Sequence, residues 1–107
     1  MDYNKLLKNI TKQEAEKALQ AIYRIQEIDT KYSKSYFWRP ARNAAQRRTR
    51  EFTEEINFTL NGNEFAYDCE YTESCQHCYF SKTILLNDEQ ITMRTINTLG
   101  KKLCDFI

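Results

Sequence analysis

The feature that most constrains this chain is an Asn61-Gly62 pair between two runs in which apolar residues recur at every second position. Both central residues of a type I′ turn need positive φ, and Asn-Gly is the pair best suited to that turn. The apolar positions are Phe52, Ile56, Phe58 and Leu60 before the turn, and Phe65, Tyr67, Cys69 and Tyr71 after it. The pattern predicts an antiparallel hairpin over about residues 52–71.

A two-residue loop also fixes which residues face each other. Leu60 then opposes Asn63, Phe58 opposes Phe65, Ile56 opposes Tyr67 and Phe52 opposes Tyr71, which gathers the apolar residues on one face, with Glu54 as the one misfit. The other face collects four carboxylates, from Glu55, Glu64, Asp68 and Glu70. Glu55 and Asp68 are predicted to lie directly opposite each other, and such a like-charge pair costs stability unless a cation or a partner lies over it.

A long helix is predicted in the first third of the chain. Thr11 and Glu14 have the spacing of a capping box, in which the hydroxyl and the carboxylate satisfy backbone N–H groups at a helix start. Apolar residues then recur at helical spacing, which predicts an amphipathic helix over about residues 12–30: Ala15, Ala18, Leu19, Ile22, Ile25 and Ile28. Residues 1–10 are expected to dock as an extra helical turn or as a short arm.

A second helix is predicted between the first helix and the hairpin. Pro40 fits the first turn of a helix, where its missing N–H costs nothing, and we expect this helix over about residues 40–50. At the helical angle of about 100° per residue, one arc of about 140° holds the arginines, with a small alanine face opposite. The arginines of that arc are Arg39, Arg42, Arg47 and Arg50.

The last third of the chain has two interpretations. Both include a loop at about residues 72–78 and a strand over about 79–86. In the preferred one, Asn87 and Gln90 cap a C-terminal helix over about 88–103; in the other, the chain turns at 87–89 and forms a fourth strand through Ile91, Met93 and Thr95. The sequence therefore predicts a single α+β domain over residues 1–107, with two N-terminal helices, a three- or four-stranded antiparallel sheet and a C-terminal helix.

The charges are strongly segregated, although the formal net charge is only +1. Residues 31–50 hold seven basic side chains and no acidic one, whereas residues 51–73 hold seven acidic side chains and no Lys or Arg. Such asymmetry points to nucleic acid or to charged proteins as partners. The plainer alternative is that the two halves neutralise each other within one fold.

The preferred functional hypothesis is non-catalytic binding of nucleic acid or of a nucleoprotein complex. Arginine offers a planar fork to phosphate, and aromatic side chains offer faces on which unstacked bases can lie. The expected contacts are Arg39, Arg42, Arg47, Arg48 and Arg50, with Tyr36 and Trp38 as stacking residues.

Two alternatives belong to other classes. Regularly spaced carboxylates on a sheet can imitate a phosphate backbone, so Glu55, Glu64, Asp68 and Glu70 predict an inhibitor that binds a nucleic-acid-processing machine, of the type phages and mobile elements use against host defences. The further alternative is a small metal-independent ribonuclease that would use Arg, Tyr, Glu and the single histidine, His77. We expect a binding protein without catalytic residues.

The four cysteines include one C-x2-C pair, Cys75 and Cys78, of the kind that grips zinc. A complete zinc site needs two more ligands, and the candidates are Cys69, His77 and Cys104. Reduced thiols and no cofactor are therefore the first expectation and zinc the alternative. With no long apolar run and no signal-peptide pattern, we expect a cytoplasmic protein that does not engage a membrane. The expected partner is nucleic acid or a nucleic-acid-binding protein complex, and the oligomeric state is left open, a homodimer included.

Overall fold

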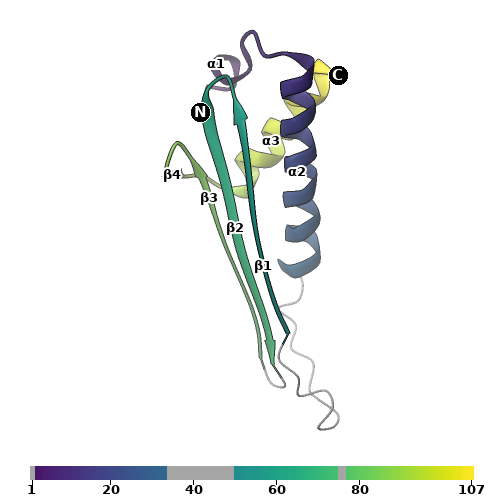
Figure 1. The fold of residues 1–107 in the computed structure, drawn as a ribbon, viewed down its shortest axis with the longest axis vertical. Coiled ribbons are helices and arrows are strands. Elements are labelled where there is room, and N and C mark those ends of the chain that lie inside the picture. Colours follow the sequence, from purple (N-terminus) through teal and green to yellow (C-terminus); the bar gives the residue numbers. More distant parts are fainter. Residues whose placement is uncertain (1, 34–49, 75–76) are drawn as a thin grey trace.

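A computed structural model of the chain describes residues 2–33, 50–74 and 77–107. The helices are α1 (Tyr3–Leu7), α2 (Lys12–Ser33) and α3 (Met93–Leu103), followed by a short 3-10 turn (Cys104–Phe106). The strands are β1 (Arg50–Leu60), β2 (Asn63–Ser74), β3 (His77–Leu86) and β4 (Glu89–Gln90). They form one antiparallel sheet in the order β1-β2-β3-β4, and α2 and α3 lie on the same side of it (Figure 1). The fold is α+β, as the sequence predicts.

The first hairpin has the predicted register at every position. Leu60 pairs with Asn63 and Phe52 with Tyr71, and the intervening pairs follow in step. Asn61 and Gly62 have φ of 54° and 81°, as a type I′ turn requires. The hairpin is longer than predicted because β1 begins at Arg50 and β2 continues to Ser74.

The predicted loop at 72–78 is therefore wrong over most of its length. Thr72 pairs with Tyr79 and Glu73 with Cys78, and only residues 75 and 76 lie outside the described part of the chain. Thr72 and Tyr79 are both good strand formers, and their pairing extends the sheet toward this end. The polar residues between them suggested a loop, but the ladder continues to the pair of Ser74 with His77.

The C-terminal segment combines parts of both predicted alternatives. Asn87 and Asp88 have φ of 50° and 68° and form a tight turn between β3 and β4, and β4 ends at Gln90. The expected cap at Asn87 is wrong: α3 begins at Met93, and the Thr92 hydroxyl caps it by accepting from the backbone N–H of Thr95 at 3.4 Å. The fourth strand exists, but it does not reach Ile91, Met93 or Thr95.

The predicted helix over 40–50 falls almost entirely on residues 34–49, which lie outside the described residues. Its last residue, Arg50, is the first residue of β1, where its backbone opposes Glu73. A helix therefore does not extend to residue 50.

The core lies between the sheet and the helices. The predicted apolar stripe of α2 is buried along its whole length, and it packs with Ile96, Leu99 and Leu103 of α3. Leu6 and Leu7 of α1 are buried as well, which confirms the docked helical turn. At the far end of α2, Tyr32 lies in an aromatic cluster, with ring centroids 4.9 Å from Phe52 and 4.7 Å from Tyr71. In the described part of the chain, no helix has both the length and the apolar character needed to cross a membrane.

Candidate protein-binding face

The side of the sheet opposite the helices forms a face that no described helix covers (Figure 1). Side chains alternate between the two faces of a strand, so every second residue of β1, β2 and β3 points to this side. We call it the open face, and its described members are Glu51, Thr53, Glu55, Asn57, Thr59, Glu64, Ala66, Asp68, Glu70, Thr72, Tyr79, Ser81, Thr83 and Leu85.

Five carboxylates lie on the open face, and all of them are exposed: Glu51, Glu55, Glu64, Asp68 and Glu70. No described member of the face is Lys or Arg. Glu55 and Asp68 are directly opposite in the register, which puts their Cβ atoms about 4.5–5.5 Å apart, and Glu70 is the diagonal neighbour of Glu55 at about 7–8 Å. The face therefore has a uniformly negative surface on β1 and β2, beside uncharged residues on β3.

Two charged groups on the covered side of the sheet, Glu54 and Lys82, are paired with residues of α2. Arg24 of α2 donates two hydrogen bonds to the Glu54 carboxylate, at 2.7 and 2.8 Å. Hydrogen bonding to Arg24 holds the pKa of Glu54 below its usual value. Lys82 forms an ion pair with Asp29 of α2. Within the described residues, by contrast, no ion pair involves any of the five open-face carboxylates.

The arginine contact explains the one misfit of the predicted hairpin. Glu54 lies on the covered face as the register requires, and α2 supplies the cation that it needs there. Local patterns in the sequence do not reveal the contact, because Arg24 and Glu54 are 30 positions apart. Helix α2 thus neutralises an acid on its own side of the sheet and leaves the other side negative.

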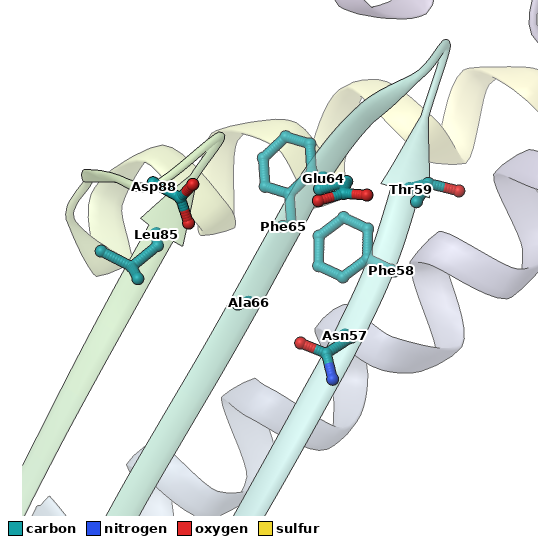
Figure 2. A pocket seen from close by; sticks show the side chains of 8 residues that line it. All are labelled: Asn57, Phe58, Thr59, Glu64, Phe65, Ala66, Leu85 and Asp88. Carbon is teal, nitrogen blue, oxygen red and sulfur yellow. The ribbon is translucent and has the colours of Figure 1, made fainter.

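A hollow of about 270 Å³ lies at one end of the open face (Figure 2). Strands β1, β2 and β3 and the β3–β4 turn all contribute to its lining, which comprises Asn57, Phe58, Thr59, Glu64, Phe65, Ala66, Leu85 and Asp88. Ala66 lies between Asn57 and Leu85 in the register, so a small side chain occupies the middle of this row. The hollow therefore combines an apolar part with two carboxylates, Glu64 and Asp88.

Asn87 joins the backbone segments that carry those two carboxylates. The Asn87 side-chain oxygen accepts from the backbone N–H of Glu64 at 2.9 Å, and the Asn87 backbone N–H donates to the Glu64 carbonyl at 2.8 Å. The Asn87 side-chain amide also donates to Asn63 Oδ1 at 2.9 Å. The turn that holds Asp88 is thereby attached to the strand that holds Glu64.

A second hollow, of about 320 Å³, lies between α2 and the edge of the sheet. It is lined by Glu14 and Lys17 of α2 together with Asn57, Phe58 and Thr59 of β1. Because it presents one acidic and one basic side chain, it has no preference for a ligand of one charge. The hollow on the open face is the one with a single sign of charge.

The structure brings together the four predicted acidic residues and adds two that were missed. Glu51 belongs to the same face because it is four residues from Glu55 in the strand, but the predicted hairpin began after it. Asp88 was missed because the preferred interpretation used Asn87 as a helix cap and placed the turn at 87–89 only in the alternative. The positive-φ preference of Asn and Asp was the signal for that turn.

The predicted nucleic-acid contacts lie mostly outside the described residues. This applies to Tyr36, Trp38, Arg39, Arg42, Arg47 and Arg48, and of Arg50 the structure describes the backbone in β1. The arginine hypothesis therefore stays a prediction from the sequence.

The cysteines of the zinc alternative are not assembled where the structure describes them. Cys69 is buried on the covered face, and burial raises the pKa of its thiol. Cys78 lies 3.9 Å from the hydroxyl of Tyr71, whose ring contacts Tyr32 near the C-terminal end of α2. Cys104 is exposed and lies 3.6 Å from the hydroxyl of Tyr23, which is nine residues before Tyr32 in the same helix. Cys75 is outside the described residues. Among the described residues, no group of three or more His, Cys, Asp or Glu side chains is arranged to hold a metal.

Comparison of the chain with protein-family models, with curated proteins and with solved structures gave no match.

Proposed function

We propose that this protein is a non-catalytic binding protein whose open face binds a basic surface of another protein, of the kind that nucleic-acid-binding proteins present. The observation that carries the proposal is a sheet face with five exposed carboxylates, no described Lys or Arg and no described covering helix. A surface that attracts phosphates through Lys and Arg also attracts carboxylates held in rows on a rigid sheet. By occupying such a surface, the protein would exclude nucleic acid from it.

The Glu55–Asp68 pair supports the same proposal. Two like charges directly opposite in a sheet destabilise it, by an amount on the order of 0.2–1 kcal/mol. This cost is offset when a cation of the partner lies over the pair, because the attraction of the two carboxylates to the cation then outweighs their mutual repulsion. The proposal requires a rigid charged surface and no catalytic group.

The test is a pull-down from the source cells with nuclease-treated lysate. One variant removes two open-face charges with little change of shape, Glu55→Gln with Asp68→Asn. The matched control removes two exposed carboxylates elsewhere, Glu16→Gln on α2 with Asp105→Asn in the C-terminal turn. We expect the parent and the control to retain the same protein and the open-face variant to lose it. Retention by the open-face variant contradicts the proposal.

A second candidate function is nucleic-acid binding through the arginine segment. The sequence favours it, since residues 31–50 hold seven basic and no acidic side chains. Binding to labelled DNA or RNA in low salt should be abolished by Arg42→Glu with Arg47→Glu, because phosphate contacts dominate such affinity. Unchanged binding of this variant, or no binding by the parent, would rule this candidate out. A partner that is lost from the pull-down on nuclease treatment would favour it.

A further inference from the structure

We propose that the hollow on the open face holds a single arginine side chain of the partner. The inference rests on the proposed function and specifies how the partner is recognised. It is carried by the hollow and its lining, because an even spread of carboxylates would attract any basic surface without selecting a residue.

The size of the hollow limits what it accepts. Sites for small molecules and cofactors usually have volumes of about 300–1,000 Å³, and this hollow has about 270 Å³ and is open to solvent on the open face. A hollow of this volume suits a single side chain that enters it from a docked protein. The lining does not enclose a free ligand on all sides.

The chemistry of the lining selects a long cationic side chain with an apolar stem. Ala66 provides apolar contact at the centre and Leu85 at one side, and Glu64 and Asp88 provide carboxylates from two different elements (Figure 2). The Asn57 side chain adds an amide oxygen as a neutral acceptor. Arginine and lysine both lay apolar stems on such surfaces while their charged ends reach polar groups.

Arginine fits better than lysine for two reasons. Its guanidinium has five N–H donors in a planar fork, so it can serve acceptors on more than one side, and it is more weakly hydrated than an ammonium group. The backbone segments that carry Glu64 and Asp88 are also joined before binding, through the three hydrogen bonds of Asn87 to the Glu64 backbone and to Asn63. Because these two segments are already joined, less backbone ordering is needed on binding.

The test measures binding of two fluorescein-labelled peptides, deca-arginine and deca-lysine, at one ionic strength. Charged hydrogen bonds of the kind proposed predict that the parent binds the arginine peptide about tenfold more tightly. Ala66→Leu fills the hollow without changing the charge, and we expect it to remove this preference. Thr83→Leu makes a similar enlargement on the open face outside the lining and should keep it. Ala66→Thr, with a β-branched residue favoured in strands, is a second filling variant in case the leucine disturbs folding.

A charge-matched pair of variants gives an independent measurement. Glu64→Gln with Asp88→Asn should remove the preference for arginine. Glu51→Gln with Glu70→Gln should weaken the binding of both peptides equally and keep the preference. Asp88→Asn suits the positive φ of 68° at this position.

The outcomes separate this inference from the proposed function. Retained arginine preference in the filling variants overturns the inference. Equal binding of both peptides by the parent, lost in the Glu55→Gln, Asp68→Asn variant, overturns the inference and leaves the proposed function standing. Binding of neither peptide by the parent contradicts both.

Discussion

The backbone N–H of Asn61 donates a 2.6 Å hydrogen bond to Oε1 of Glu14, which joins the tip of the first hairpin to the start of helix α2. The side-chain amide of Asn61 donates to the backbone carbonyls of Lys5 and Lys8, at 3.2 and 2.8 Å. Glu14 was expected to complete a capping box with Thr11. The Thr11 hydroxyl does accept from the backbone N–H of Glu14 at 3.1 Å, but the Glu14 carboxylate is directed to the hairpin. The hairpin tip, α1 and α2 are thereby held together.

The first prediction concerns Asn61→Gly. Glycine keeps the positive φ of the turn but removes the amide that satisfies the carbonyls of Lys5 and Lys8. The free energy of unfolding should fall by about 1–2 kcal/mol, measured by urea denaturation. Asn9→Gly is the matched control, because Asn9 also has a positive φ, of 61°, and glycine is preferred just after a helix end. Equal stability of the two variants would show that the side-chain contacts of Asn61 contribute nothing.

The second prediction concerns the pH dependence of stability through Glu54. Hydrogen bonding to Arg24 lowers the pKa of Glu54 in the folded protein, so the contribution of this pair is fully present above the unfolded pKa, near 4.5. It is lost as the pH falls through the lower folded pKa. Arg24 is substantially exposed, so we expect a contribution of only about 1 kcal/mol.

The measurement compares the parent with Glu54→Gln at pH 6 and at pH 3. The parent should be the more stable of the two at pH 6, and the difference should shrink at pH 3. Glu27→Gln is the control, since Glu27 makes a 3.2 Å contact to the same arginine from an exposed position on α2. A Glu54 variant that follows the parent at both pH values would show that the pair does not stabilise the fold.

The third prediction concerns Tyr67, which is fully buried in the core. Its hydroxyl has no hydrogen-bond partner among the described residues. Burial is the main reason why the pKa of Tyr67 is raised above its ordinary value. Removing an unsatisfied polar group from a core is nearly neutral or stabilising. Tyr67→Phe should therefore leave the thermal midpoint unchanged or raise it, whereas Phe65→Leu, a change of volume at a neighbouring core position, should lower it. A clear loss of stability in Tyr67→Phe would reveal a partner for the hydroxyl.

The fourth prediction connects stability with function at the Glu55–Asp68 pair. Asp68→Thr removes the like-charge repulsion and introduces a good strand former, so the free energy of unfolding should rise by about 0.5 kcal/mol. The same variant should bind the basic partner less tightly. The rise in the free energy of unfolding should be largest in low salt, since added salt screens exposed charges. A loss of stability would mean that the pair is not repulsive in the fold.

Much of the sheet could be predicted because Asn-Gly and the alternation of apolar residues act locally. The register of the first hairpin depends on φ at two residues and on the burial of one face, and both are visible in the sequence. The same local rule applies to Asn87 and Asp88, whose turn belongs only to the second of the two predicted alternatives, because a run with helix character follows it. Thr92, five residues later, starts that helix.

What could not be predicted depends on contacts between distant segments. The ion pair of Arg24 with Glu54, the hydrogen bonds of Asn61 to α1 and α2, and the attachment of Glu64 to Asn87 all join residues at least 23 positions apart. They decide which acids are neutralised and which remain exposed. The acidic face was predicted from alternation alone, but its hollow depends on the second turn and on Ala66.

Binding of basic surfaces by the open face is tested most directly by an amide NMR titration of the ¹⁵N-labelled protein with the deca-arginine peptide. The chain has exposed carboxylates on both sides, including Glu16 and Glu27 on α2 and Glu55 and Asp68 on the open face. If the open face binds basic surfaces, the largest shift changes should occur at Glu55, Asp68 and their neighbours on β1 and β2, while α2 stays nearly unchanged. Equal shift changes at Glu16 and Glu27 would contradict selective binding to the open face, because the peptide would then bind exposed carboxylates anywhere on the molecule.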